Sequence, residues 1–329
     1  MKYIVYGAGA IGGVIGARLH EIGRDVVLIC RGAQLDAIRR DGLTVKTPDG
    51  TANFRVPAVA HPSEIAFDPG DVVFLAMKSQ DTEGALRDLA AVAPPEVAIV
   101  CAQNGVDNER MALRRFAHVY GMLVLMPCTY LEPGVIVNHA SGAWGVLDAG
   151  RYPSGRDTTI ERVCADLTTA RFSSLTVPSI MRWKHAKLLG NLNNAFVAAC
   201  GADARAPDFA AAIRAEALAC YAAASIDCAS DDEMRERRQA SGMQYRPVDG
   251  AARDGGSSWQ SLARGLPTIE TDYLNGEIVM LGRLHGVPTP CNLALQIVAN
   301  RMAHERHAPG AFPVDELQHL ADELRSASG

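Results

Sequence analysis

A glycine-rich run near the start of the chain has the spacing that binds a pyrophosphate: Gly7-Ala8-Gly9-Ala10-Ile11-Gly12. The first glycine permits a tight turn, the second lets the backbone approach phosphates, and the third lets the following helix pack closely on a sheet. A helix N-terminus also offers unpaired N–H groups and a positive dipole end to an anion. We therefore predict a dinucleotide site here; the alternative is a glycine-rich turn that binds no ligand.

A second chemical signal follows the next apolar run. NAD-specific sites usually end this strand with an acid that binds the ribose hydroxyls. Here the run DVVLIC ends at Cys30, and Arg31 and Gly32 come next. A guanidinium can bind a 2′-phosphate through paired, charge-assisted hydrogen bonds. The position therefore favours NADP(H) over NAD(H), and a solvated surface arginine is the alternative.

The elements that must position these residues are strands and helices in alternation. Four apolar runs are typical of buried strands: Lys2–Tyr6, Asp25–Cys30, Val72–Ala76 and Val97–Cys101. They are continuous rather than alternating, which suits parallel strands covered on both faces. With the helical spacing of Ala10–Ile22 they predict an α/β fold, a Rossmann domain with a doubly wound sheet. Leu43–Val56 is expected to form a hairpin around Pro48-Asp49-Gly50.

The second half of the chain has a different pattern. Alanine- or leucine-rich stretches with helical period occupy Trp183–Cys200, Phe209–Ser225 and Thr268–His285, without a clear strand. We therefore expect two domains, an NADP-binding Rossmann domain at residues 1–177 and an all-α substrate domain at residues 178–329. Residues 235–258, rich in glycine and arginine, are expected to form an unusually long loop, and such loops are often functional.

Composition excludes several classes of protein. A chain of 329 residues is too long for one typical core, and a net charge of −5 gives no footprint for nucleic acid. The eight cysteines are scattered without a CxxC pair, so we expect reduced thiols and no metal site. The chain shows neither a secretory signal nor a membrane-length apolar run. We expect a cytoplasmic protein that acts on a small molecule, with a homodimer left open.

Further motifs together resemble one family, the 2-dehydropantoate 2-reductases, also called ketopantoate reductases. Besides the glycine run and Arg31, they are AMKSQDT at 76–82, CAQNGVDN at 101–108, PGVI at 133–136, WKHAKLLGN at 183–191, SSW at 257–259, TIETDYLNGEIV at 268–279 and HGVPTP at 285–290. The resemblance implies a Rossmann domain followed by a helical domain. It also implies hydride transfer from NADPH to the 2-oxo group of ketopantoate, in pantothenate biosynthesis.

Reduction of a ketone needs a group that meets the negative charge forming on oxygen and then supplies a proton. The run at 183–191 offers two lysines, and Lys187 shares a helix face with Asn191, four residues further on. The resemblance assigns the catalytic role to Lys187; without it, a surface lysine would be the default. Lys184 is then expected to point elsewhere as an ordinary surface residue.

The resemblance also gives Glu270 a catalytic and cofactor-binding role. It stands twelve residues after Ser258, the spacing that the family keeps between its substrate-site serine and a glutamate near the lysine. A glutamate within reach of Lys187 would orient the ammonium and keep it protonated. The alternative is a glutamate that caps a helix beginning after Thr268.

Other matched positions imply further binding residues. Ser258 and Asn191 would bind the substrate. Asn104 matches a family asparagine near the nicotinamide and the substrate, or it forms a simple Asn-Gly turn with no ligand. Lys78 follows an apolar strand and matches a lysine that contacts the cofactor, at the edge where open α/β sheets bind ligands.

Two positions depart from the family pattern on the substrate side. The family often has asparagine four residues beyond Asn191 and three residues before its serine, where this chain has Ala195 and Gly255. The expected loop, which carries Arg246 and Arg253, also stands where the family usually has helix. Removing groups that hydrogen-bond a substrate changes which substrate is preferred. We therefore hypothesise a different 2-oxo acid, with contacts supplied by the loop.

Three functions are consistent with these residues. The first is reduction of ketopantoate, and the second is a related reductase or dehydrogenase of another small 2-oxo or hydroxy acid. The third is a non-catalytic sensor that binds NADP. The joint presence of Lys187, Asn191, Ser258 and Glu270 argues against the sensor, because a binding module does not need all four.

Overall fold

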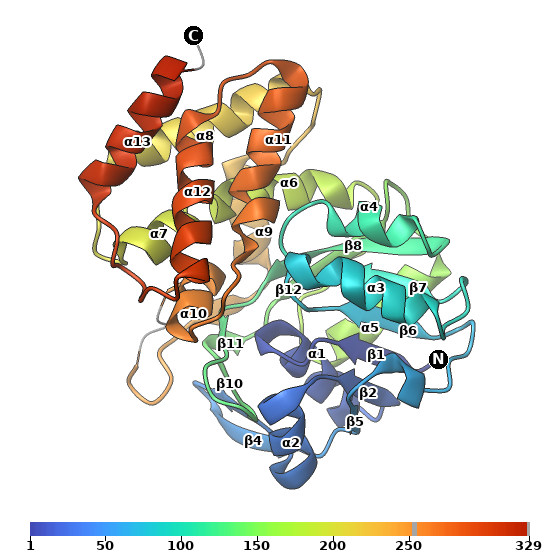
Figure 1. The fold of residues 1–329 in the computed structure, drawn as a ribbon. Coiled ribbons are helices and arrows are strands. Elements are labelled where there is room, and N and C mark those ends of the chain that lie inside the picture. Colours follow the sequence, from blue (N-terminus) through green and yellow to red (C-terminus); the bar gives the residue numbers. More distant parts are fainter. Residues whose placement is uncertain (252–254, 328–329) are drawn as a thin grey trace. The chain divides into compact units, whose positions relative to one another are not determined.

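The computed structural model describes residues 1–251 and 255–327 of the chain. These residues form two compact units, each described by itself below (Figure 1). The first, here called the Rossmann unit, comprises Met1–Lys184 and Ala229–Arg253; the second, the helical unit, comprises His185–Cys228 and Asp254–Gly329. The expected division into residues 1–177 and 178–329 thus differs from the observed units in one main respect, the return of 229–253 to the Rossmann unit.

A seven-stranded sheet forms the centre of the Rossmann unit, in the order β12-β8-β7-β6-β1-β2-β5. All neighbours are parallel except β12, which runs antiparallel to β8. In chain order the strands are β1 (Tyr3–Tyr6), β2 (Val26–Ile29), β5 (Ala58–Val59), β6 (Val72–Leu75), β7 (Ala98–Cys101), β8 (His118–Leu125) and β12 (Val146–Arg151). The four strands predicted from continuous apolar runs are confirmed as β1, β2, β6 and β7.

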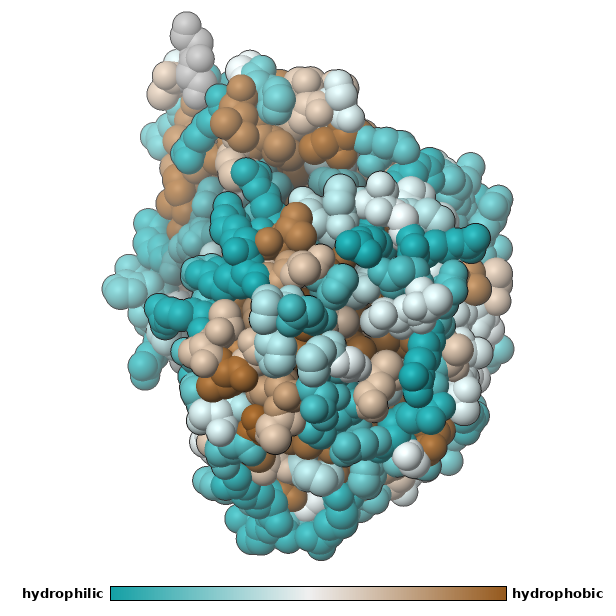
Figure 2. All heavy atoms as spheres, turned by 90° about the vertical axis from the view of Figure 1, so that its right-hand side faces the viewer, coloured by the Kyte–Doolittle hydropathy of each residue, from teal (hydrophilic) through white to brown (hydrophobic). Residues whose placement is uncertain are grey.

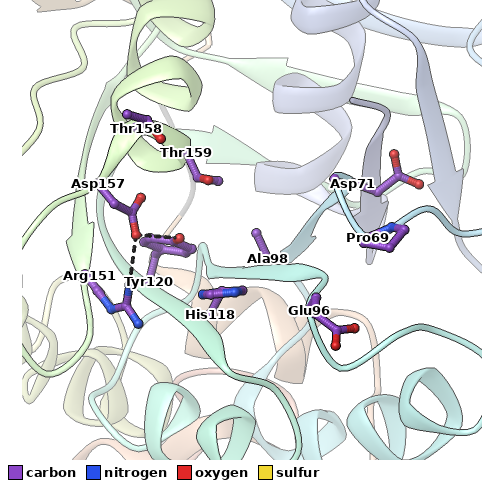
Figure 3. A pocket seen from close by; sticks show the side chains of 11 residues that line it. Pro69, Asp71, Glu96, Ala98, His118, Tyr120, Arg151, Asp157, Thr158 and Thr159 are labelled. Atoms are coloured by element: carbon purple, nitrogen blue, oxygen red, sulfur yellow. Dashed lines mark hydrogen bonds and ion pairs between the residues drawn. The ribbon is translucent and has the colours of Figure 1, made fainter.

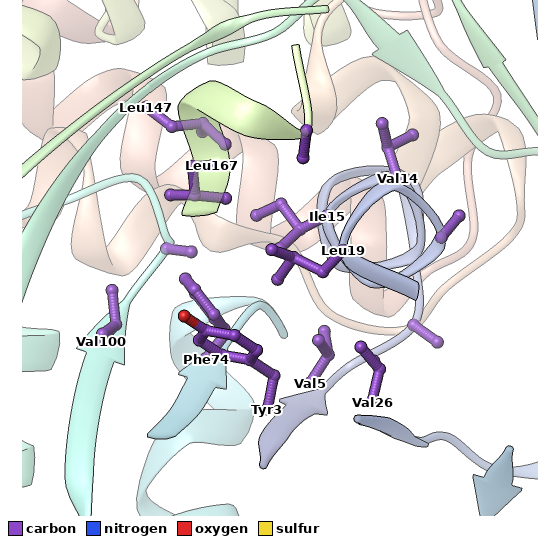
Figure 4. Packing of buried hydrophobic residues seen from close by; sticks show 14 of the residues in the cluster. Tyr3, Val5, Val14, Ile15, Leu19, Val26, Phe74, Val100, Leu147 and Leu167 are labelled. Atoms are coloured by element: carbon purple, nitrogen blue, oxygen red, sulfur yellow. The ribbon is translucent and has the colours of Figure 1, made fainter. Parts of the chain in front are cut away.

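Helices cover both faces of this sheet, as the continuous apolar strands require. On one face α1 (Ala10–Glu21) and α5 (Thr158–Thr169) pack on inward residues such as Tyr3, Val5 and Phe74 (Figure 4). Connections between parallel strands are right-handed, and the chain continues from β1 and from β6 toward opposite edges of the sheet. The helices that follow β6 and β7 therefore cover the other face. They are α3 (Thr82–Ala90) and α4 (Asn108–Leu113).

Smaller elements complete the Rossmann unit. The predicted hairpin is confirmed as β3 (Leu43–Thr47) and β4 (Gly50–Phe54), and it extends to a second sheet in the order β4-β3-β10-β9. The remaining elements are α2 (Gly32–Asp41), η1 (Pro62–Glu64), η2 (Ser79–Asp81), β9 (Cys128–Thr129), β10 (Val135–Asn138) and β11 (Ala140–Gly142).

The long loop expected at 235–258 is wrong for residues 235–245 and 257–258, whereas residues 246–251 lie outside the named helices and strands, and residues 252–254 lie outside the described residues. The segment begins inside helix α9 (Asp231–Ala240) and continues into β13 (Met243–Tyr245), which pairs with β11. A capping box between Ser230 and Glu233 starts α9, and a buried ion pair between Arg237 and Asp148 of β12 attaches it. Because α9 is highly charged, its apolar periodicity is weak, and its capping box is the one local signal that could have revealed it.

The helical unit contains no strand among its described residues. Its elements are the last turns of α6 (Ile180–Asn191), followed by α7 (Asn194–Cys200), α8 (Pro207–Ala223), α10 (Ser257–Ala263), η3 (Glu270–Tyr273), α11 (Asn275–His285), α12 (Pro290–His304) and α13 (Val314–Ala327). The expected helix at 183–200 is therefore two helices with a break between them. Helix α6 begins in the Rossmann unit and ends in the helical unit.

Several large apolar side chains are exposed on the described surface. Figure 2 shows a face on which hydrophilic residues separate small hydrophobic clusters. The most exposed large apolar side chains, Leu284, Leu175 and Tyr245, are far apart in the sequence. Among the described residues, no helix is both long and apolar enough to cross a membrane.

Candidate active site

The glycine turn lies where the order of the sheet reverses. Strands β1 and β6 are neighbours, and ligands of open α/β sheets bind at the carboxyl ends of such strands. Gly7 follows β1 with φ +104°, and a Cβ there would lie 2.6 Å from the backbone nitrogen of Met77, just beyond β6. A Cβ on Gly12 would overlap the carbonyl oxygen of Gly7. The turn therefore tolerates only glycine at these positions.

The start of α1 fits a pyrophosphate. Its N-cap is Gly9, no side chain caps it, and its first turn contains no acidic residue. The amide groups of the first turn and the positive dipole end are thus left for an anion. A Cβ on Gly9 would meet only the Tyr130 ring, at 3.9 Å, so the approach to this backbone is open.

A buried glutamine, overlooked in the sequence, holds this turn in place. Gln34 Nε2 donates to the carbonyl oxygen of Ala8 at 2.7 Å, and Gln34 Oε1 accepts from the backbone nitrogen of Gly134 at 2.7 Å. Because both ends of the amide are used, Gln34 connects the glycine turn to the loop before β10. Only the glycines stand out in the sequence, because Gln34 acts across 100 residues.

Arg31 is exposed and follows β2 with only Cys30 between them, and it is the N-cap residue of α2. Burial raises the pKa of the Tyr6 phenol, and the nearby Arg31 guanidinium opposes this shift. Burial also raises the pKa of the Asp81 carboxyl, against the positive charges of Arg31 and Lys78. Both cations thus lie near Asp81, at the carboxyl ends of β2 and β6.

A buried polar network fixes the turns that carry Lys78 and Asn104. Gln103 Nε2 donates to the carbonyl oxygen of Met77 at 2.9 Å and to Thr82 Oγ1 at 2.8 Å. Asn108 Nδ2 donates to the carbonyl oxygen of Asn104 at 3.0 Å, and Asn108 Oδ1 accepts from Thr82 at 2.8 Å. The next residue, Gly105, has φ +74°, in the left-handed region that favours glycine.

Lys184 is not the surface residue expected from the sequence. Its side chain is buried in the Rossmann unit, where it forms an ion pair with buried Glu109 of α4. Its Nζ also donates to the carbonyl oxygen of Gln103 at 3.2 Å. The spacing on α6 gave no sign of this partner, because Glu109 lies 75 residues away in the chain.

In the helical unit, Lys187 and Asn191 lie on one face of α6. Lys187 is half-buried, and its Nζ donates to Asn191 Oδ1 at 3.1 Å. The other amide atom, Asn191 Nδ2, is buried and has no hydrogen-bond partner among the described residues. Because buried polar atoms are nearly always satisfied, this donor fits a ligand beside Lys187.

Ser258 and Glu270 are buried in the same unit. Ser258 lies in α10, and its Oγ lacks a hydrogen-bond partner within the described part of the chain. Glu270 is the first residue of the short 3₁₀ helix η3, whose N-cap residue Ile269 makes no side-chain capping bond.

The two departures from the family pattern have a structural setting. Ala195 is buried in α7. Gly255 has φ +50°, and a Cβ there would overlap the Trp259 side chain. An asparagine at 255 would therefore require Trp259 to move. Of the two arginines assigned to the expected loop, Arg246 forms an exposed ion pair with Asp49, and Arg253 lies outside the described residues.

Asn275 and Asn292, which the sequence argument did not single out, support the break between α6 and α7. Asn275 Nδ2 donates to the carbonyl oxygen of Leu192 at 3.1 Å and to Asn292 Oδ1 at 3.0 Å. Asn292 Nδ2 donates in turn to Glu216 Oε2 at 2.7 Å. The network satisfies a carbonyl that the helix break exposes, immediately after Asn191.

One cavity of about 360 Å³ lies elsewhere, at the amino-terminal end of β7 and β8 in the Rossmann unit (Figure 3). Two of its three carboxylates accept hydrogen bonds: Asp157 from Arg151 and Tyr120, and Asp71 from the backbone nitrogen of Lys2. None of the predicted site residues lines it. Within residues 1–251 and 255–327, no group of three His, Cys, Asp or Glu could hold a metal.

Sequence families decide the kind of enzyme. The model described as ketopantoate reductase PanE/ApbA matches residues 3–153, and that of its C-terminal part matches residues 179–303. The chain belongs to the ketopantoate reductase family. It is thus an oxidoreductase of an NAD(P)-dependent family, as the resemblance predicted.

Individual relatives agree with this assignment. The 2-dehydropantoate 2-reductase of Pyrococcus horikoshii is 27% identical over 301 residues, covering 90% of this chain and 95% of that protein. The one from Mesorhizobium japonicum is 29% identical over 335 residues, covering 93% and 99%. Both are similar to this chain along nearly its whole length.

Solved structures show the same fold. A PanE/ApbA family ketopantoate reductase from Ralstonia eutropha has a TM-score of 0.75 at 24% identity, covering 93% of this chain and 99% of that one. A ternary structure of D-mandelate dehydrogenase with NADH and anilino(oxo)acetate has a TM-score of 0.79 at 20% identity, covering 94% and 100%. At these identities the likeness concerns the fold alone.

Proposed function

We propose that this oxidoreductase reduces 2-dehydropantoate to pantoate with NADPH, a step of pantothenate biosynthesis. The observation that carries the proposal is the Lys187–Asn191 pair, in which a half-buried ammonium is held beside an amide donor that has no hydrogen-bond partner among residues 1–251 and 255–327. The names of the relatives from Pyrococcus and Mesorhizobium support the choice of substrate.

In the proposed reaction, bound NADPH supplies the hydride. Lys187 faces the oxygen of the 2-oxo group, stabilises the negative charge that forms there and donates a proton to it. Asn191 accepts a hydrogen bond from Nζ, which keeps the ammonium in one orientation. Solvent then returns the proton to Lys187.

The other site residues bind the substrate or the cofactor and orient the reacting groups. Ser258 Oγ and Asn191 Nδ2 donate to the substrate, which satisfies two buried atoms that lack partners in the described part of the chain. Glu270 orients the Lys187 ammonium and contacts the cofactor. Asn104 contacts the nicotinamide and the substrate.

The cofactor preference rests on Arg31. It stands at the end of β2 in place of the acid of NAD sites, and it is exposed and therefore available to a 2′-phosphate. Lys78, near the same edge, adds positive charge for the phosphates. We infer that the enzyme prefers NADPH to NADH.

A second candidate is a different small 2-oxo acid. Ala195 offers no hydrogen bond where relatives often have asparagine, and Trp259 leaves no room for a side chain at Gly255. Both changes weaken recognition of a substrate hydroxyl rather than the reduction itself.

The test is NADPH oxidation with purified protein and three acids: ketopantoate, 3-methyl-2-oxobutanoate and phenylglyoxylate. We expect kcat/KM to be at least about tenfold higher for ketopantoate than for the other two, which lack its hydroxyl. Equal values for all three would favour the second candidate. Tight NADPH binding without turnover of any of the three acids would favour the third function, a non-catalytic sensor that binds NADP.

A further inference from the structure

The ion pair between Lys184 and Glu109 is among the most deeply buried charge pairs of the Rossmann unit. The two side chains are 3% and 0% exposed. Burial raises the pKa of the Glu109 carboxyl, and the Lys184 ammonium opposes this shift. The second carboxyl oxygen of Glu109, Oε2, has no hydrogen-bond partner in the described residues. Gly121 of β8 provides the space, because a Cβ there would lie 3.2 Å from Glu109 Oε1.

Stability alone does not account for such a pair. Removing two charges from water costs about as much as their attraction returns, so apolar side chains of similar volume often stabilise a fold equally well. The pair does make one contact that apolar side chains could not make, because Lys184 Nζ donates to the carbonyl oxygen of Gln103 at 3.2 Å.

That contact acts on the peptide bond that leads into Asn104. On the other side of Asn104, its own carbonyl oxygen accepts a hydrogen bond from Asn108 Nδ2 at 3.0 Å. Both carbonyl groups that flank the Asn104 side chain are therefore held by buried donors. The Gln103 side chain is fixed as well, through Met77 and Thr82.

We propose that Lys184, held by Glu109, is a positioning residue for Asn104. The ammonium fixes the Gln103 carbonyl, and this sets the direction in which the Asn104 side chain points. Lys184 itself touches neither substrate nor cofactor. The inference rests on the proposed function, in which Asn104 contacts the nicotinamide and the substrate.

The kinetic test combines the double variant Lys184→Met/Glu109→Leu with Asn104→Ala. We expect the double variant to fold with at least tenfold lower kcat. In the Asn104→Ala background the same double change should alter kcat by less than twofold, because its effect passes through Asn104. Losses that multiply in the combined variant, or a folded double variant with wild-type kcat, would overturn the proposal.

A matched control is the pair Arg237→Met/Asp148→Leu, which removes another buried ion pair of the same unit. It should change the melting temperature but alter kcat by less than twofold. If Lys184→Met/Glu109→Leu does not fold, Lys184→Gln/Glu109→Gln replaces it, because glutamine is one atom shorter than lysine and falls short of the Gln103 carbonyl. For this variant too, wild-type kcat, or losses that multiply with Asn104→Ala, would overturn the proposal.

Hydrogen exchange of the peptide covering residues 102–107 tests the positioning without any turnover. We expect at least tenfold faster exchange in the Lys184/Glu109 double variant and no change in the Arg237/Asp148 control. Unchanged exchange would overturn the proposal. A wild-type protein that reduces none of the three acids would instead contradict the proposed function, and the exchange experiment would still decide on Lys184.

Discussion

Among single residues, we propose that Arg31 determines the choice between the two nicotinamide cofactors. It is the first residue after Cys30 at the end of β2, and it is exposed. Another arginine, Arg39, lies on the same helix and donates to the carbonyl oxygen of Ala58 at 3.0 Å. The two have the same charge but different positions relative to the strand end.

We expect Arg31→Ala to weaken NADPH binding by about 10- to 100-fold, the value of a hydrogen-bonded charge pair. NADH binding should change less than about twofold, because NADH has no 2′-phosphate. Fluorescence titration with each cofactor measures both constants. Arg39→Ala is the control and should leave the NADPH-to-NADH ratio unchanged. An NADPH-to-NADH affinity ratio in Arg31→Ala equal to that of the wild type would refute the role of Arg31.

Contacts between residues close in the sequence can be predicted from it, whereas contacts between distant residues cannot. The pairing of Lys187 with Asn191 follows from helical spacing alone, because residues four apart share a face. The burial of Lys184 depends on its ion pair with Glu109, and the Gln34 side-chain oxygen depends on the backbone nitrogen of Gly134 as its hydrogen-bond donor. Such partners are brought together only by the fold, so no local pattern could predict them.

At the scale of elements, the break between α6 and α7 ends the helix that carries Lys187 and Asn191. The Asn275 amide satisfies the Leu192 carbonyl at this break. We expect Asn275→Ala to lower the free energy of unfolding by about 1–3 kcal/mol, because it leaves a buried carbonyl unpaired. Urea denaturation measures the loss.

The control for this prediction is Asn300→Ala, which removes an exposed hydrogen bond to Asp272. It should cost less than about 0.5 kcal/mol, as is usual for surface positions. Equal losses for Asn275→Ala and Asn300→Ala would show that the helix break needs no such support.

Helix α9 gives a prediction that depends on pH. Hydrogen bonds from Arg182 and from the Ser230 backbone hold the pKa of Glu233 at about 2, below its ordinary value of 4.5. A lowered pKa stabilises the fold above the ordinary value, and this stabilisation is lost as the pH falls toward the folded value.

Wild-type protein should therefore melt at a higher temperature than Glu233→Gln at pH 7, and the difference should shrink as the pH falls from about 4.5 toward 2. Thermal unfolding followed by circular dichroism at several pH values measures it. A difference that is constant across this range would show that the ionised carboxylate does not attach α9.

Elements differ in how well the sequence predicts them. Strands β1, β2, β6 and β7 are continuous apolar runs, and each was predicted. Strand β12 contains Asp148 and Gly150, which hide its strand character. The carboxylate is buried because Arg237 of α9 reaches it, and a Cβ on Gly150 would overlap the Val177 carbonyl. These reasons lie in packing, so they are invisible in a local pattern.

For the whole molecule, the chain passes between the two compact units three times, after residues 184, 228 and 253. The sequence predicted two domains from the change of pattern, but it could not show that α9 and β13 return to the Rossmann unit. That return depends on pairing with β11 and on the ion pair with β12.

The glycine turn, Arg31 and Lys78 all belong to the Rossmann unit, so NADPH should stabilise that unit in particular. A ligand at 100 times its dissociation constant stabilises the folded state by about 2.7 kcal/mol. Calorimetry with and without NADPH should show the transition of the Rossmann unit shifted upward. An unchanged thermogram at saturating NADPH would contradict a dinucleotide site at the glycine turn.

The most direct test of the whole account is the variant Lys187→Ala. Loss of a proton donor that also stabilises charge should lower kcat for ketopantoate by about 10²- to 10⁴-fold. NADPH affinity should stay within about twofold, because the glycine turn and Arg31 are untouched. Steady-state kinetics and a binding titration on the same preparation give both values. Turnover near the wild-type rate in Lys187→Ala would contradict the mechanism.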